Sequence, residues 1–237
     1  MPLESVDRVL VITAHPDDVD FGAAGSVAVF TDQGVDVQYC IVTDGDAGGF
    51  DHAVERSAMA SIRRAEQRAA AKEVGVSEVH FLGYPDGRLE VSLALRRDLT
   101  RVIRAVRPQR VICQSPERNY DRIFASHPDH LAAGEATLCA VYPDSRNPFT
   151  FTELIDDGYD AWTVAEVWMM AGNRSNHAVD ITAHFDRKIA ALMRHESQMP
   201  NPDGVRQRVR AWVESTATQF GLGEGCLAEA FQVVTTG

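Results

Sequence analysis

The sequence predicts an α/β fold of the Rossmann-like type, in which a mostly parallel sheet is flanked by helices on both faces. Short β-rich runs alternate with longer helical patterns, and this alternation is typical of parallel sheets covered by helices. Two polar motifs follow directly after predicted strands. With 237 residues, no internal repeat and no low-complexity tract, the chain is expected to form one domain over residues 1–237.

The first half of the chain carries the regular alternation. An apolar run makes Arg8–Thr13 a buried strand, and a glycine-rich loop over 44–49 follows the second strand. Residues 61–74 are rich in alanine with charged residues on one face, which predicts a helix. A later helix, Leu93–Val106, is stopped by Pro108. In order, the expected elements are strand Arg8–Thr13, helix 22–33, strand 37–43, helix 61–74, strand 78–82, helix Leu93–Val106, strand Arg110–Gln114 and helix 131–140, opened by His130.

The second half is less regular. Glu166–Met170 and residues 228–234 are expected to be strands, and residues 181–197 and 205–220 are expected to be helices. A turn is predicted at 201–204, where Asn, Pro, Asp and Gly follow one another.

Composition narrows the classes of function. The net charge of −11 argues against a broad nucleic-acid surface, which needs clustered basic residues. No apolar run approaches the roughly 20 residues that span a bilayer, so no membrane insertion is expected. The apolar run near the N-terminus is too short for a signal peptide, and the four cysteines form no CxxC pair, which favours a cytoplasmic protein with reduced thiols. The sequence leaves a homo-oligomer open.

Two similar motifs concentrate imidazole and carboxylate groups. They are Ala14-His15-Pro16-Asp17-Asp18 and Ser126-His127-Pro128-Asp129-His130. Each follows the carboxyl end of a predicted strand, which is where open α/β sheets bind ligands. Either motif alone is equally well explained as the cap of a helix N-terminus, but capping does not explain why both occur at strand ends.

The two motifs together predict a metal site. His15 and Asp18 are three residues apart and would face the same way in a helical turn, and His130 can supply a third ligand from the second motif. Three such ligands with one open position are typical of catalytic zinc, although Fe²⁺ and other divalent metals also suit imidazole and carboxylate.

Asp17, His127 and Asp129 remain for acid–base chemistry. A carboxylate beside a metal-activated water can act as general base, and an imidazole can stabilise an oxyanion or protonate a departing amine. A second carboxylate can hold that imidazole in one tautomer. Of the other histidines, His52 and His80 are expected at the surface or at strand ends, and His184 and His195 in hydrogen-bonded structural positions on a helix.

At these motifs the sequence resembles the LmbE-like, or PIG-L, family of zinc-dependent de-N-acetylases. Further similar stretches occur at 43–49, 62–66, 179–182, 188–198 and 228–231, so the resemblance covers essentially the whole chain. It implies zinc ligation by His15, Asp18 and His130 and removal of an acetyl group from an N-acetylglucosamine conjugate, a small-molecule amino sugar.

The resemblance also implies roles for individual residues. Asp17 would be the general base, and His127, oriented by Asp129, would stabilise the oxyanion or act as acid. Arg63 and Asp86 would contact the sugar, although Arg63 could instead pair with a neighbouring carboxylate and Asp86 could simply belong to a turn with Gly87.

Three other functions stay open at this point. One is an amidase acting on a thiol- or lipid-linked sugar amide. The second is a Rossmann-like nucleotide- or metabolite-binding module that uses the glycines of 22–25 or 45–49, although neither segment has the GxGxxG pattern. The third is a metal-dependent phosphoesterase, suggested by the pair Asp18 and Asp20.

Overall fold

A computed structural model describes residues 5–51 and 53–237. One seven-stranded sheet forms its centre, in the order β3-β2-β1-β4-β5-β7-β6. The first five strands in chain order pair in parallel, and β7 pairs antiparallel with both β5 and β6. The strands are β1 Arg8–Thr13, β2 Asp36–Thr43, β3 Glu78–Tyr84, β4 Arg110–Gln114, β5 Glu166–Met170, β6 His177–Asp180 and β7 Ala228–Thr235.

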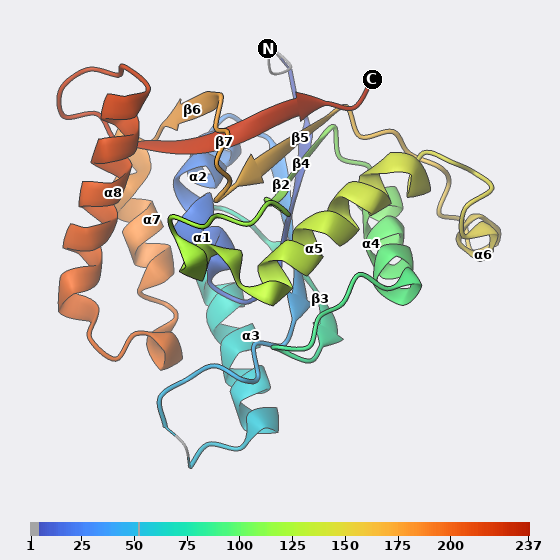
Figure 1. Ribbon diagram of the computed structural model, residues 1–237, viewed down its shortest axis with the longest axis horizontal. Coiled ribbons are helices and arrows are strands. Elements are labelled where there is room, and N and C mark those ends of the chain that lie inside the picture. Colours follow the sequence, from blue (N-terminus) through green and yellow to red (C-terminus); the bar gives the residue numbers. More distant parts are fainter. Residues whose placement is uncertain (1–4, 52) are drawn as a thin grey trace.

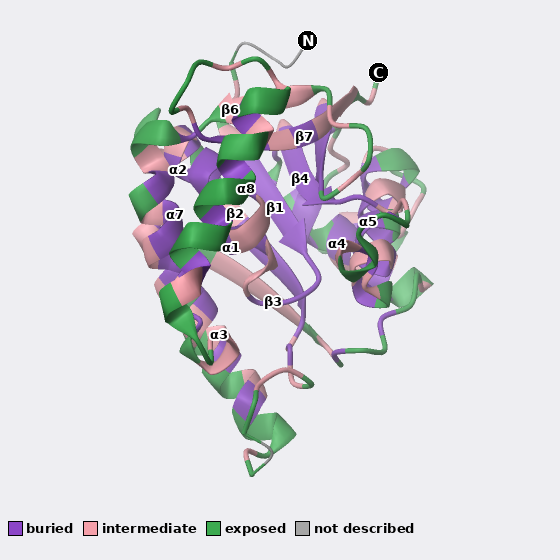
Figure 2. Ribbon diagram, turned by 60° about the vertical axis from the view of Figure 1, so that its left-hand side comes forward, coloured by how far each residue is buried: buried purple, intermediate pink, exposed green. Residues whose placement is uncertain are grey.

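Helices cover both faces of this sheet, as the sequence predicts (Figures 1 and 2). On one face, α4 and α5 pack on side chains such as Leu10 and Ile12 of β1. On the other face, α1, α2, α3 and α7 pack on Val9 and Val11 of the same strand. The α-helices are α1 Asp18–Gly22, α2 Ala24–Asp32, α3 Arg56–Glu73, α4 Leu93–Val106, α5 Pro128–Cys139, α6 Thr152–Asp156, α7 Phe185–Leu192 and α8 Val205–Gln219.

The strand order places a crevice between β1 and β4. From β1 the chain proceeds outward to β2 and β3, and then crosses back to the other side of β1 to form β4. Helices that leave β1 and β4 therefore diverge to opposite faces, and open α/β sheets bind ligands at such a point. Both polar motifs follow these two strands.

Several expected helix boundaries are wrong, each for a local reason. The helix expected over 22–33 is two helices that meet at Ala23, and the carbonyls of Asp20 and Phe21 before the break accept hydrogen bonds from Lys188. The helix expected over 181–197 covers only Phe185–Leu192, because the chain beyond it turns His195 inward.

The helix of the second motif starts earlier than expected. It begins at Pro128 rather than after His130, because proline suits the first helical position and the His127 side chain caps the helix. The α3 helix also starts earlier, at Arg56, and β6 and α6 were not expected. No helix in the described ranges is long and apolar enough to cross a membrane.

Candidate active site

Three side chains of the two motifs converge at the crevice. The Nδ1 atom of His15 lies 3.3 Å from the Asp18 carboxylate and 3.2 Å from Nε2 of His130, and that Nε2 atom lies 3.0 Å from Asp18. His15 follows β1, Asp18 begins α1 and His130 lies in the first turn of α5. The structure thus brings together the three residues that the sequence predicts as metal ligands.

The hydrogen bonds of the two imidazoles suit a cation. Nε2 of His15 faces Asp86 at 3.0 Å and Asp129 at 3.2 Å, and Nδ1 of His130 faces the Ala125 carbonyl at 3.4 Å. Because these nitrogens face acceptors, they keep their protons when the rings are neutral, and the opposite nitrogens, which face each other and Asp18, become ligand atoms when a metal ion replaces the proton there. Tetrahedral zinc with bonds of 2.0–2.1 Å has ligand atoms roughly 3.4 Å apart, close to these separations. The donor set therefore fits a divalent metal.

The charges of the site also favour a cation. Although burial opposes the charged imidazole, contacts with Asp129, Asp18 and Asp86 raise the pKa of His15 to about 12. Burial alone would raise the pKa of Asp18, but His130 and His15 hold it well below its usual value. The surrounding carboxylates thus stabilise positive charge where the three side chains meet.

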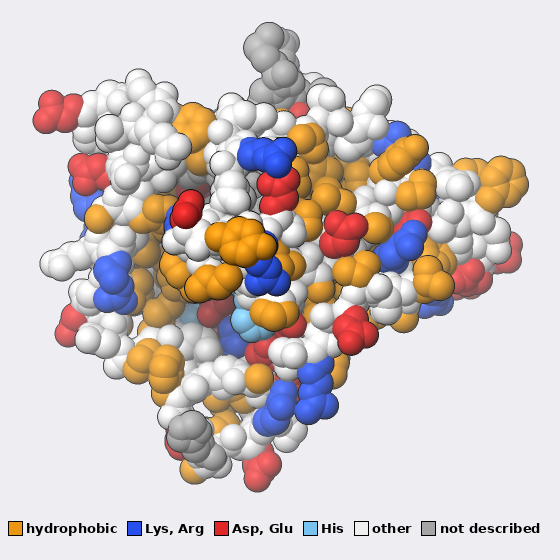
Figure 3. Space-filling view, viewed as in Figure 1, with side chains coloured by type: hydrophobic (Ala, Val, Ile, Leu, Met, Phe, Trp, Pro, Cys, Tyr) orange, Lys and Arg blue, Asp and Glu red, His pale blue; other side chains and the backbone are white. Residues whose placement is uncertain are grey.

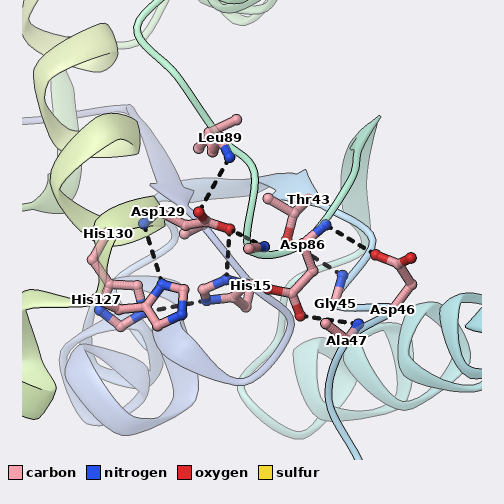
Figure 4. Close-up of polar contacts among 12 residues, drawn as sticks. His15, Thr43, Gly45, Asp46, Ala47, Asp86, Leu89, His127, Asp129 and His130 are labelled. Carbon is pink, nitrogen blue, oxygen red and sulfur yellow. Dashed lines mark hydrogen bonds and ion pairs between the residues drawn. The ribbon is translucent and has the colours of Figure 1, made fainter.

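Asp129 contacts a different histidine from the one expected. The sequence-based interpretation has its carboxylate hold His127, whereas in the structure it lies against His15 and also accepts hydrogen bonds from the amides of Gly87 and Leu89 (Figure 4). Its backbone amide, not its side chain, donates to Nδ1 of His127 at 3.2 Å. The reason is the helix start: the residue two positions after an N-cap presents its amide to the cap.

His127 lies beside the three converging side chains. Its ring centre is 4.9 Å from that of His15 and 5.4 Å from that of His130. Because Nδ1 accepts the Asp129 amide, Nε2 carries the proton of the neutral ring and is free to donate. Burial and the neighbouring His15 lower the pKa of His127, which favours this neutral form.

Among the residues that the structure describes, two other groupings could also hold a metal. They are His15 with His127 and His130, and His15 with Asp86 and Asp129. In the second grouping both carboxylates face Nε2 of His15, so they orient this ring rather than complete a triangle with it.

Asp17 has a strained backbone that two side chains of α3 hold in place. Its φ angle is 92°, in the left-handed region that costs a non-glycine residue about 1–3 kcal/mol. Arg63 donates to the carbonyl of Pro16, and Gln67 accepts the amide of Asp17 at 2.8 Å. These two groups belong to the same peptide bond, so Arg63 and Gln67, one helical turn apart, hold it at both ends.

The carboxylate of Asp17 is close to Arg63, at 3.2 Å. Burial raises the pKa of Asp17 to about 6, and the Arg63 guanidinium opposes this shift. A raised pKa suits a group that must take up and release a proton near neutral pH.

Arg63 and Asp86 are both buried in contacts within the protein. Arg63 also donates to the Gly45 carbonyl at 2.9 Å. A Cβ atom at position 45 would lie only 2.5 Å from the guanidinium of Arg63, so glycine is needed there. Asp86 accepts the Ala47 amide at 3.3 Å in addition to facing His15. Their contact with a substrate stays a prediction, and the observed contacts show that both residues position the site.

A buried polar cluster behind α1 was not recognised as part of the site. It consists of Asp20, Gln67, Lys188, His195 and Glu229. Asp20 accepts from Gln67 at 2.9 Å and contacts His195 at 2.8 Å, while Lys188 pairs with Glu229 at 2.6 Å. The hydrogen-bonded position expected for His195 is confirmed, but the residue lies beyond the end of α7 and not on a helix. The one signal in the sequence was that Gln67 follows Arg63 by one helical turn, on the same side of a helix.

The other histidines have separate surroundings. His80 lies on β3 and contacts Gln38, and His184 lies in a 3₁₀ turn, η3 Thr182–His184, against Asp32. His52 is outside the described residues. The glycines that could have formed a nucleotide-binding loop instead allow close packing against neighbouring side chains. A Cβ atom at Gly25, for example, would lie 2.6 Å from the side chain of Ile181.

Comparison with known proteins shows the family to which the chain belongs. Residues 10–141 match the model of the PIG-L family, described as GlcNAc-PI de-N-acetylase. The chain belongs to this family of deacetylases. It is 34% identical to diacetylchitobiose deacetylase of Thermococcus kodakarensis over 94% of this chain and 81% of that protein. It is also 30% identical to a probable N-acetyl-α-D-glucosaminyl L-malate deacetylase 2 of Bacillus cereus, over 81% of this chain and 83% of that one.

Two solved structures superpose closely on this chain. N,N′-diacetylchitobiose deacetylase from Pyrococcus horikoshii, in complex with an inhibitor, superposes with a TM-score of 0.90 at 29% identity, over 98% of this chain and 85% of that one. The 4-carboxy-2-hydroxymuconate hydratase GalB from Pseudomonas putida superposes with a TM-score of 0.80 at 21% identity, which shows a shared fold only.

Proposed function

We propose that this protein removes the acetyl group from an N-acetylglucosamine conjugate, with a zinc ion held by His15, Asp18 and His130. The observation that carries this proposal is the convergence of these three side chains within 3.0–3.3 Å, with Asp17 and His127 beside them. Family membership supplies the reaction class, because the named relatives are deacetylases of amino-sugar compounds. Fe²⁺ would suit the same ligands.

When bound, such an ion supplies Lewis acidity for activating water and polarising the amide carbonyl. Asp17 takes the proton of the attacking water and returns it to the departing nitrogen, so that acetate and the free amine are released. His127 donates its Nε2 proton in a hydrogen bond to the oxyanion that forms at the carbonyl oxygen. Asp129 and Asp86 accept from Nε2 of His15 and thereby hold its Nδ1 toward Asp18 and His130, where the ion would bind.

Arg63 has a positioning role in this scheme, because it holds the Pro16 carbonyl and the Asp17 carboxylate. Direct contact of Arg63 or Asp86 with the sugar remains part of the proposal. Cytoplasmic location, a single domain and a homo-oligomer likewise remain expectations from the sequence.

The test is metal content combined with release of free amine from N-acetylglucosamine conjugates. We expect one metal per chain, loss of activity on chelation, and recovery when zinc is restored. Metal-free protein that hydrolyses these amides at the full rate would contradict the proposal. Hydrolysis of phosphate esters instead would point to the phosphoesterase.

A further inference from the structure

A large cavity opens on the side of the candidate metal site formed by Asp18 and His130. Its volume is about 670 Å³, and both of these residues line it. The outer wall comes from three segments that are distant in sequence: the 3₁₀ turn η1 Ile123–Ser126, residues 198–201 and helix α8. In the space-filling view, hydrophobic side chains surround a hollow in which histidine and acidic side chains are visible (Figure 3). The cavity is thus continuous with the site of the proposed reaction.

The walls of this cavity are mainly hydrophobic. Met170 and Val209 form its inner surface and are almost fully buried, whereas Trp212 and Phe124 lie farther out, with 37% and 72% of their surface exposed. The Arg122 guanidinium lies over both aromatic rings, 5.7 Å from the centre of Trp212 and 5.2 Å from that of Phe124. Apolar surface that stays open beside a polar site marks a place where a ligand binds.

The cavity is larger than the reaction requires. Cavities of about 300–1,000 Å³ hold drug-sized ligands, whereas an acetyl group has only three non-hydrogen atoms. The acetyl group is small and the sugar ring is polar, so the part of the conjugate that suits these mainly hydrophobic walls is an apolar substituent on the sugar.

We propose that this cavity binds an apolar aglycone, an aryl or alkyl group joined to the N-acetylglucosamine. The inference rests on the proposed function and deepens it by naming the class of conjugate. Trp212 and Phe124 contact the aglycone, and Met170 and Val209 line the deeper part of its site. Burial of such a group should increase the affinity for the conjugate, because each apolar carbon removed from water stabilises the complex.

The test compares benzyl and methyl glycosides of N-acetylglucosamine. We expect kcat/KM to be about tenfold higher for the benzyl glycoside. Binding is measured separately, by calorimetry with the benzyl and methyl glycosides of glucosamine, which carry no acetyl group and are not turned over. We expect a dissociation constant about tenfold lower for the benzyl compound.

Variants assign the effect to this cavity. Trp212→Ala and Phe124→Ala should each bring the benzyl-to-methyl ratios of kcat/KM and of affinity close to one. The control is Phe149→Ala, which removes an exposed aromatic ring outside this cavity and should leave both ratios unchanged.

Each contrary outcome has a distinct meaning. Equal affinity and equal kcat/KM for the two aglycones would overturn the inference while leaving the proposed function intact. Failure to hydrolyse either glycoside would contradict the proposed function, and the calorimetry would still decide the inference. A third substrate, the methyl glycoside with an N-hexanoyl group in place of acetyl, tests the acyl side. If this longer acyl chain raises kcat/KM in a way that depends on Trp212, and the benzyl group does not, the cavity is an acyl site and the inference is overturned. Variants that change only the oligomeric state would overturn it in favour of self-association.

Discussion

Residues 15–18 and residues 127–130 lie on opposite sides of one crevice, and the protein holds them in different ways. The first segment has a strained residue, Asp17, whose peptide bond is held by Arg63 and Gln67. The second segment is an unstrained helix start, with His127 as the cap and proline at the first helical position.

The difference shows which segment requires outside support. A left-handed Asp17 persists only because neighbouring side chains stabilise it, and a buried cluster around Asp20 lies behind those side chains. The geometry of His127 follows from the local rules of helix capping alone. Distant substitutions are therefore expected to affect the first segment more than the second.

The largest effect is expected for Asp17→Asn. Asparagine keeps the shape and the hydrogen-bond acceptor for Arg63 but cannot take up a proton, so kcat should fall about 10³-fold. Metal content, measured by elemental analysis, should not change. The control is Asp156→Asn, at an exposed carboxylate near the end of α6, and nearly full activity of Asp17→Asn would exclude this residue as the base.

In the second segment, His127→Asn separates capping from catalysis. Asparagine is a good N-cap but does not carry the imidazole donor, so we expect kcat to fall about 100-fold with little change in stability. His127→Ala should lose the same activity and also about 1 kcal/mol of unfolding free energy, measured by denaturant titration. Equal stability of the two variants would show that the cap contributes nothing.

The smallest effect is expected for Gln67→Met, which removes both hydrogen bonds of a buried side chain of similar size. We expect kcat to fall about tenfold while KM and metal content stay within twofold, because Asp17 loses the partner of its amide and the site keeps its ligands. The control on the same helix is Lys72→Met, at an exposed position. A loss of metal in Gln67→Met, or a change in KM alone, would show that Gln67 does not act through Asp17.

Elements with a strong local pattern could be predicted from the sequence. The bounds of Arg8–Thr13, Leu93–Val106, Arg110–Gln114 and Glu166–Met170 are confirmed, because each is an apolar run or a periodic helix with a clear stop. β6 His177–Asp180 was missed, since a four-residue edge strand of mostly half-buried residues shows no alternation. The break at Ala23 depends on Lys188, which is too distant in sequence to be seen.

The site shows the same division. The convergence of His15, Asp18 and His130 could be predicted because each follows a strand end at one edge of the sheet. Two other contacts could not be predicted, namely that of Asp129 with His15 and the hydrogen bond from the Asp17 amide to Gln67. Both depend on how α3 and α5 are placed in the fold. Sequence motifs indicated which side chains meet, and tertiary packing decides which pairs touch.

The proposed division of roles between Asp17 and Asp18 is tested most directly by the zinc content of Asp17→Asn and Asp18→Asn, measured side by side. These adjacent carboxylates are alike in chemistry, yet Asp18 faces both histidines whereas Asp17 faces Arg63. We expect about one zinc per chain in Asp17→Asn and little or none in Asp18→Asn. Retention of zinc by Asp18→Asn together with its loss from Asp17→Asn would contradict it.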